Sequence, residues 1–504
     1  MRITKAMKSS LVHETGFRMR RHLAIHSFLF CFLQLAMAQV PPLTDFGYKQ
    51  LSVNNHRQAP LGTRYCLVVL INDATNGVFA TNASFYQNII FNAAASNGVN
   101  GYIGENSCGR LQLLPANVGG GTGVMGPLNL TPAELDQIDS NLGKQTATPT
   151  DASVALSAAV RNGFPLANYD FDNDGKVSQD ELLLLVVANR ADRGRGQTAS
   201  FSINLAGKSC EMRVSSVPEY TVTNRFSTVV HELVHNFANM YDLYYYTTYY
   251  ATNYTLNTLR TLASDSGWVH LDPWHKMTFG WNEPRIVSMR EGGRFFISAA
   301  QNANPTASLL LYDPGRGTSE YFLLEYRTAN RAAGPGFDYQ LGTNGLLLWH
   351  IQQDSNHNLI KTISPFGFTG TNTTPFANWT EGPPNNATPD APWGPDDITP
   401  YLRFNDGTQA IARIRTLPFQ PSDNGIYVEV LVDRSDVVTW VDYSDPGFLQ
   451  LGTFLYPYHT LQQGISGVGY GGNLTIKTSV GAPAPITVSK PMTLRAFGGS
   501  VRLH

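Results

Sequence analysis

The sequence predicts an α+β fold with a β-rich second part, and three observations support this prediction. Up to about residue 290, short apolar strand patterns are interspersed with amphipathic helix patterns. Beyond it, short strands separated by turn residues dominate. The composition, with 45 glycines, 29 prolines and 23 tyrosines in 504 residues, is typical of a loop-rich protein with much β-structure. The mixed first part is compatible with an α+β or an α/β fold, and we take α+β as the expectation.

The first predicted element is a strand at residues 64–73, "RYCLVVLIND", whose continuous apolar run indicates burial on both faces. Residues 83–97 predict a helix, and residues 104–118 predict a turn that leads into a strand. Two further helices are expected at 131–142 and 151–164, each opened by a threonine or aspartate cap. The remaining elements of this part are a loop at 170–181, a strand at 182–190 and a helix at 226–237.

The second part contains six short strand patterns, namely "RFFISAA", "SLLLYD", "YFLLEYR", "GLLLWHIQQ", "ARIRTL" and "IYVEVLVD". Residues 364–399 are rich in proline, asparagine and threonine and predict a long surface loop. The last seventy residues change character again, and predict a short helix and several short strands.

The N-terminus predicts an export signal over residues 1–38. "MRRH" provides a positive segment, an apolar core follows, and "AMA" before Gln39 is a small-residue cleavage site. We therefore expect a secreted, extracellular protein without stable membrane insertion. Net charge is −2 and only 15% of residues are charged, with no long basic run, so nucleic acid is not expected as a partner.

Three cysteines remain after the export signal, which allows one disulfide at most and leaves a free thiol. Cys66 lies in the apolar strand and is expected to be a buried thiol. Cys108 and Cys210 lie in polar segments flanked by glycine and serine, and are the expected pair.

The helix at 226–237 carries the strongest motif, "HELVH". Its apolar residues repeat at i, i+3, i+4 and i+7, which predicts one buried stripe. His231 and His235 project together from the other side, with the i, i+4 spacing of a zinc-binding helix. Glu232 lies beside them, placed as the general base that takes a proton from the metal-activated water.

A catalytic zinc site needs a third protein ligand. In metzincin-type sites the helix ends at a glycine, and the third ligand follows three residues later. The matching position here is Ala238, but Asn239 also tolerates the left-handed turn, and Asp242 stands three residues beyond it. Asp242 is therefore the expected third ligand, with His270 as the rival.

Several stretches together resemble the immune inhibitor A-type secreted metallopeptidases. They are "HELVHNFANMYDLY", "SGWVHLDPWHKMTFGWNEP", "EYFLLEYR" and "GLLLWHI", with "ENSCGRLQL" and "NYDFDNDGKV" upstream. The resemblance covers roughly residues 60–435 and implies a zincin-like fold with one catalytic Zn²⁺. The expected domains are the export signal, a zincin-like peptidase domain at 39–290, a β-rich continuation at 291–435, and a C-terminal segment at 436–504 that resembles the start of a parallel β-helix.

A second cation site is predicted at "DFDNDGKVSQDE", which fits the EF-hand loop pattern. Gly175 takes the sharp-turn position, and Lys176 would contribute its main-chain carbonyl. The expected ligands of a structural Ca²⁺ ion are Asp170, Asp172, Asp174, Lys176, Ser178 and Glu181.

The sequence therefore predicts a secreted zinc-dependent endopeptidase, a hydrolase that cleaves peptide bonds through a metal-activated water. Its expected partners are protein or peptide substrates, and a monomer is expected. The alternative is a catalytically weak, zinc- and calcium-stabilised extracellular binding protein. Activity on unfolded protein that a zinc chelator abolishes would separate the two.

Overall fold

The computed structural model describes residues 40–50, 59–72, 78–94, 98–139, 148–189, 197–219, 226–238, 240, 242–243, 255–256, 269–328, 337–338, 345–359, 402, 404–408, 410–417, 424–432, 438–448, 450, 452–468, 472–477, 488 and 492–497. The predicted export signal and the predicted loop at 364–399 lie outside these residues. Within the described part of the chain, no helix has the length and hydropathy needed to cross a membrane.

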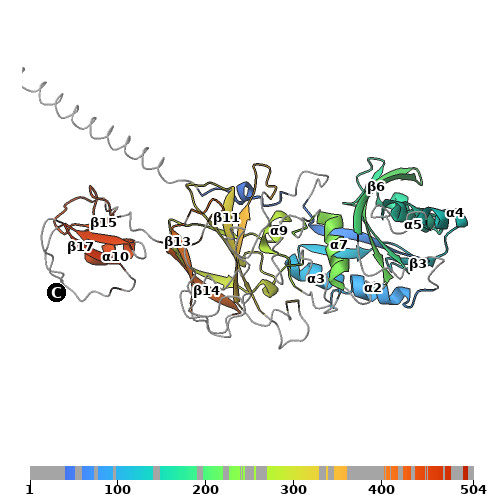
Figure 1. Ribbon diagram of the computed structural model, residues 1–504, viewed down its shortest axis with the longest axis horizontal. Helices are drawn as coiled ribbons and strands as arrows, with labels where there is room; N and C mark the ends of the chain where they lie inside the picture. The colour runs from blue at the N-terminus through green and yellow to red at the C-terminus, as the bar shows by residue number, and fades with distance from the viewer. Residues whose placement is uncertain are drawn as a thin grey trace, which may run out of the picture. The chain divides into compact units, whose positions relative to one another are not determined.

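The largest sheet, to which β3 and β6 in Figure 1 belong, has seven strands, and six of them point in the same direction. They are β1 (Gly62–Ile71), β2 (Leu111–Pro115), β3 (Val124–Leu128), β4 (Lys176–Ser178), β5 (Leu182–Ala188), β6 (Gln197–Leu205) and β7 (Lys208–Pro218). The order is β2-β1-β5-β7-β4, with β3 also on β1 and β6 on β7. Only β6 is antiparallel to its partner, β7. Ala206 and Gly207, with φ of 51° and 76°, form the two-residue turn that such a hairpin favours.

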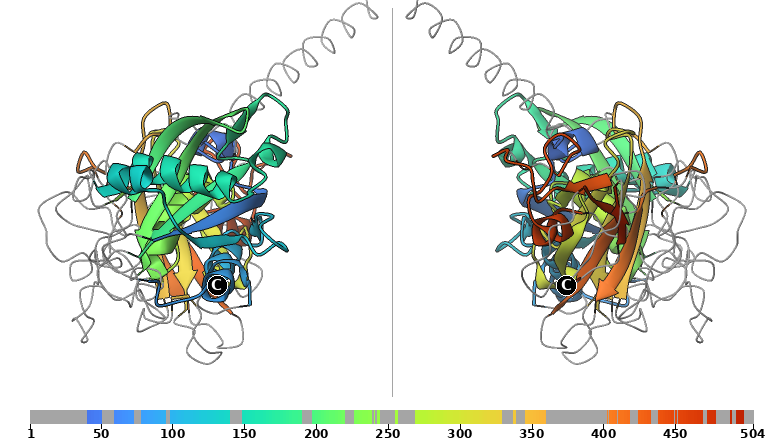
Figure 2. Two further views of the ribbon diagram at one scale, coloured as in Figure 1. Left: turned by 90° about the vertical axis from the view of Figure 1, so that its right-hand side faces the viewer. Right: turned by 90° about the vertical axis from the view of Figure 1, so that its left-hand side faces the viewer.

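Helices cover both faces of this sheet because alternate residues of each strand point to opposite sides. Cys66, Val68 and Leu70 of β1 pack in a core with α2, α3 and α7, whereas Leu67 and Val69 pack in a second core with α4 and α5. The left view of Figure 2 has α5 in front of the sheet. The helices of this part are α2 (Ala83–Phe91), α3 (Val99–Asn106), α4 (Pro132–Asp139), α5 (Thr148–Arg161) and α7 (Phe226–Ala238), with 3₁₀ turns η1 (Leu43–Phe46) and η2 (Leu166–Tyr169).

The expectation of an α+β fold of zincin type is wrong in this part of the chain. The structure has a mixed α/β arrangement, in which β1, β2, β3 and β5 are parallel, with α2 and α3 between β1 and β2 in sequence and α4 and α5 between β3 and β5. Parallel neighbours need such crossover connections, and a sheet between two helical layers is buried on both faces. The seven residues of β5 are all buried, which explains the unbroken apolar run "LLLLVVA".

The β-rich part consists of two sheets that share one core. One sheet has the order β12-β11-β10-β8 and the other β13-β14-β9. Their apolar residues pack together around Trp349 and Phe322. The elements are α9 (Pro273–Thr278), β8 (Arg285–Ser288), β9 (Gly293–Ser298), η3 (Ala300–Asn302), β10 (Ser308–Tyr312), β11 (Glu320–Arg327), β12 (Gly345–Gln352), β13 (Ala412–Leu417) and β14 (Gly425–Val432).

The C-terminal segment has its own small core. Three parallel strands, β15 (Val438–Val441), β16 (Asn473–Ile476) and β17 (Thr493–Ala496), stack in that order. The helix α10 (Leu461–Gly467) opens with a capping box at Thr460 and packs Leu461 and Ile465 against them. The expected short helix and short strands are therefore confirmed.

The predicted disulfide is wrong, because Cys108 and Cys210 are free thiols. Cys210 is fully buried in β7, in the core that α5 covers. Cys108 follows α3, whose apolar residues pack in the core on the other face of the sheet. The sheet itself therefore separates the two residues. Cys66 is fully buried, as expected, and this burial raises the pKa of its thiol to about 12.

Candidate metal centre

Helix α7 carries the predicted motif, and its packing explains why it forms. Val229, Val230, Leu233, Val234 and Phe237 are at most 2% exposed and form the predicted apolar stripe. No glycine or proline interrupts the helix. The stripe fixes the rotation of α7 against the sheet, and therefore fixes the side from which its polar residues project.

Three side-chain atoms converge on that side. His231 Nε2 lies 2.9 Å from His235 Nε2, and Asp242 Oδ1 lies 3.2 Å from the first and 3.0 Å from the second. Two ligand atoms about 2.1 Å from one tetrahedral zinc are roughly 3.4 Å apart. The observed triangle is only a few tenths of an ångström tighter, so this donor set fits a small divalent cation such as Zn²⁺. The structure thus brings together the three residues expected as zinc ligands.

The imidazole of His235 is oriented by the segment after the helix. Its Nδ1 lies 2.9 Å from the main-chain oxygen of Met240. A carbonyl can only accept, so Nδ1 carries a proton, and Nε2 is the nitrogen left to face a metal ion. Histidine ligands commonly have such a hydrogen bond on the nitrogen that faces away from the metal. The Met240 carbonyl therefore prepares His235 to coordinate through Nε2.

Burial and neighbouring polar groups shift the pKa values of both carboxyl groups near the centre. Burial disfavours the ionised form of Asp242, but hydrogen bonds and charge from His231 and His235 outweigh burial and hold the pKa of this carboxyl below its usual value. Glu232 is 7% exposed, and its burial raises the pKa of its carboxyl, although His231 and Thr198 partly offset this effect. Asp242 is thus ionised as a ligand must be, whereas Glu232 is shifted toward holding a proton.

Glu232 has partners on the hairpin β6–β7 that sequence reasoning missed. Thr198 Oγ1 lies 2.8 Å from Glu232 Oε2, and Ser215 Oγ lies 2.8 Å from the Glu232 carbonyl oxygen. Neither strand was predicted, because their sequences contain many polar residues. The alternation of Thr198, Ser200 and Ser202 with Phe201 and Ile203 is a period-2 signal that could have identified β6.

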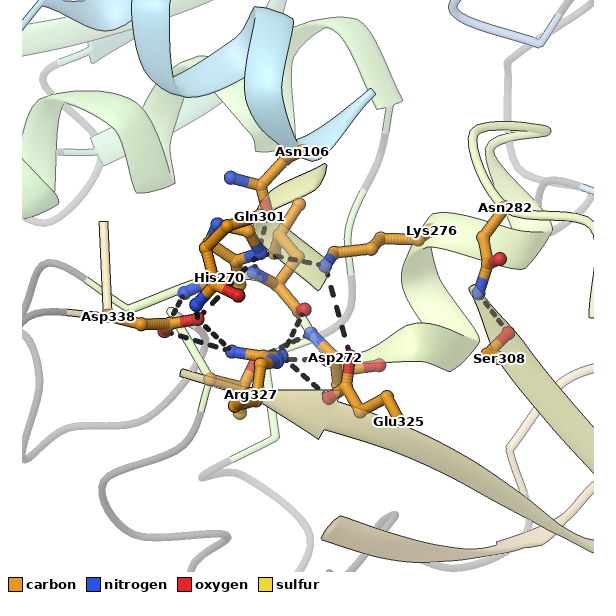
Figure 3. A network of polar contacts seen from close by, with 12 residues as sticks. Asn106, His270, Asp272, Lys276, Asn282, Gln301, Ser308, Glu325, Arg327 and Asp338 are labelled. Atoms are coloured by element: carbon orange, nitrogen blue, oxygen red, sulfur yellow. Dashed lines mark hydrogen bonds and ion pairs between the residues drawn. The ribbon is translucent and has the colours of Figure 1, made fainter. Parts of the chain in front are cut away.

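The rival ligand, His270, belongs to a different cluster (Figure 3). It is fully buried, with Nε2 2.5 Å from Glu105 Oε1 and Nδ1 3.1 Å from Lys276 Nζ. Neither contact involves α7 or Asp242. His270 is therefore a buried hydrogen-bonded histidine, and Asp242 is the residue placed beside the two histidines of α7.

The predicted calcium loop also gathers its acidic residues. Carboxylate oxygens of Asp170, Asp172 and Asp174 lie within 4.8 Å of one another. Gly175 has φ of +85°, which a sharp turn at this position requires. Glu181 folds back over the loop, where Oε1 accepts from the main-chain N–H of Phe171 at 2.7 Å. This arrangement directs several oxygens to one region, as a hard cation requires.

The remaining predicted calcium ligands, Lys176 and Ser178, form strand β4. Ser178 donates from its main-chain N–H to Glu181 Oε2 at 2.8 Å, so this residue lies against the expected bidentate carboxylate. Asp170 Oδ1 is buried and has no hydrogen-bond partner among the described residues. A buried carboxylate oxygen without a partner is costly, and a cation at the loop would compensate for it.

Other expectations at the centre lie outside the described residues, including the left-handed turn at Asn239. The sequence matches no protein-family model, and a search of curated proteins finds no similar sequence.

Proposed function

We propose that this chain is a secreted zinc-dependent endopeptidase that cleaves protein or peptide substrates. One observation carries the proposal: two imidazole nitrogens and a carboxylate oxygen lie within 3.2 Å of one another, next to a buried glutamate on the same helix. Three nitrogen and oxygen ligands with a neighbouring carboxylate are the protein groups that metal-assisted hydrolysis requires.

His231, His235 and Asp242 would hold the ion. When bound, Zn²⁺ polarises the scissile carbonyl and lowers the pKa of water. Glu232 serves as the general base, taking a proton from the attacking water and passing it to the leaving amine.

The acidic loop at Asp170–Glu181 is proposed to hold a structural Ca²⁺. The partnerless Asp170 Oδ1 and the three converging aspartates support this assignment. The resemblance of several stretches to the immune inhibitor A-type secreted metallopeptidases supports the proposed activity and the catalytic zinc.

The experiment is metal analysis of the purified chain together with digestion of an unfolded protein. Hydrolysis should disappear with a zinc-selective chelator and return when Zn²⁺ is added back in stoichiometric amount. A protein that holds one equivalent of zinc but cleaves no member of a broad peptide library contradicts the proposal. That result would favour a zinc- and calcium-stabilised binding protein.

A further inference from the structure

Strand β6 places one hydroxyl directly beside the carboxylate of Glu232. Thr198 is paired with Ser215 of β7 in the antiparallel register of the hairpin. The two side chains share the face of the sheet that contacts α7, since both contact Glu232. Thr198 Oγ1 lies 2.8 Å from Glu232 Oε2, 2.9 Å from the Glu232 carbonyl oxygen and 3.3 Å from Ser215 Oγ.

Each hydroxyl can donate only one hydrogen bond, and this limit decides which of these contacts Thr198 makes as a donor. Ser215 Oγ lies 2.8 Å from the Glu232 carbonyl oxygen, and it receives a long hydrogen bond of 3.4 Å from the Asn236 amide. Ser215 therefore donates its hydrogen to the carbonyl oxygen of Glu232. The hydrogen of Thr198 is then left for Glu232 Oε2, where a bond to a carboxylate is stronger than one to a neutral oxygen.

We propose that Thr198 is a positioning residue for Glu232. Its hydroxyl donates to Oε2 and fixes the rotation of the carboxylate, which leaves Oε1 as the atom that exchanges protons during hydrolysis. The catalytic consequence rests on the proposed function, whereas the contact itself does not. Because Thr198 lies on the hairpin and Glu232 on α7, the edge strand of the sheet sets the geometry of the base.

The first test measures the contact in metal-free protein, without reference to activity. Thr198→Val, Glu232→Met and the double variant are compared by thermal unfolding in excess chelator. If the two side chains interact, the double variant should lose less than the sum of the single losses, by about 2 °C or more. Ser215→Ala is the matched control, since its bond to the main-chain carbonyl survives Glu232→Met. In the double variant of Ser215→Ala and Glu232→Met, the two shifts in melting temperature should therefore add.

The second test measures peptide hydrolysis at full zinc content. Thr198→Val should lower kcat about ten- to a hundredfold with little change in KM, because a base out of position slows chemistry but not substrate binding. Thr198→Ser keeps the hydroxyl and should restore most of kcat. Should Thr198→Val fail to fold, Thr198→Ala against Thr198→Ser gives the same comparison.

Additive unfolding shifts for Thr198→Val and Glu232→Met would overturn the proposal, as would Thr198→Val with wild-type kcat. Wild-type protein that binds zinc, shows the coupled unfolding shifts and hydrolyses nothing would overturn the proposed function but keep the contact. The two failures are therefore distinguishable.

Discussion

Glu232 is the residue on which the proposed hydrolysis depends most directly, because it is beside the predicted ligands without being one of them. Glu232→Ala should keep stoichiometric zinc and a folded α7, since the apolar stripe and the ligand side chains stay in place. Activity should fall by more than about a hundredfold, as is usual when a general base is removed. Zinc content by atomic absorption and initial rates on a peptide substrate check this. Normal cleavage by the variant would exclude Glu232 as the base.

Asp242 and His270 give a matched pair of ligand substitutions. Asp242→Ala should weaken zinc binding by at least about a hundredfold, because it removes the carboxylate 3.0 Å from His235 Nε2. His270→Ala removes a buried partner of Glu105, so it should lower the melting temperature but leave zinc affinity unchanged. Competition with a chromophoric chelator measures both affinities. Equal losses in the two variants would contradict the choice of Asp242.

The sequence predicted that His231 and His235 lie together because their spacing on one helix determines this, whereas Asp242 was chosen from the turn expected after the helix. The i, i+4 histidines need only a helix, and the apolar stripe indicates which side is buried. Thr198, Ser215 and the Met240 carbonyl could not be found in this way. Thr198 and Ser215 reach Glu232 through hairpin register, and the Met240 carbonyl reaches His235 through the path of the chain after the helix. Neither is a local property of the sequence.

At the scale of elements, calcium binding to the acidic loop between η2 and β5 should raise the stability of the folded protein. Calcium at a hundred times its Kd would stabilise the folded state by about 2.7 kcal/mol. Wild-type protein saturated with zinc should therefore melt at a higher temperature in millimolar Ca²⁺, and Asp170→Asn should lose most of this increase. Asp180→Asn is the control, since Asp180 pairs with Arg64 and lies outside the ligand positions. An identical calcium response in Asp170→Asn would mean that the loop binds no calcium.

Elements were predictable where the pattern is local and strong. β5 is a continuous apolar run, β1 ends in one, and α7 has clear periodicity. The sheet order was not predictable, since pairing β1 with β5 and β5 with β7 depends on contacts between distant residues. The fold class was wrong for the same reason. Individual strands do not indicate whether their neighbours are parallel.

At the scale of the whole molecule, a buried polar network connects the α/β part to the β-rich part. Arg327 of β11 is fully buried, with Nη1 3.0 Å from Asp338 Oδ1 and Nη2 2.6 Å from Glu325 Oε1. Lys276 of α9 lies 3.1 Å from His270, which bonds Glu105 of α3. Glu105 and His270 are 165 residues apart in the chain. Because such charges are stable in the interior only when paired, the network specifies how these segments meet.

The network makes stability depend on pH through Glu105. Burial raises the pKa of this carboxyl from 4.5 to about 8, with the charge of Asp338 adding to the effect. Between these values the folded state holds a proton that the unfolded state has lost. The stabilisation from Glu105 is therefore complete below about pH 4.5 and is lost as pH rises through 8. Glu105→Gln cannot ionise and should lack this loss.

The measurement is the difference in melting temperature between Glu105→Gln and wild type from pH 5 to 8.5. It should shift steadily in favour of the variant as pH rises, because only the wild type must take up a proton at Glu105 when it folds. Glu283→Gln is the control: hydrogen bonds from Tyr48 and Arg110 hold the pKa of Glu283 below its usual value, so its contribution changes only at lower pH. A constant difference for Glu105→Gln across the range would show that this carboxyl is already ionised in the folded protein. The network would then hold one more negative charge at neutral pH, at the carboxylate beside His270 Nε2.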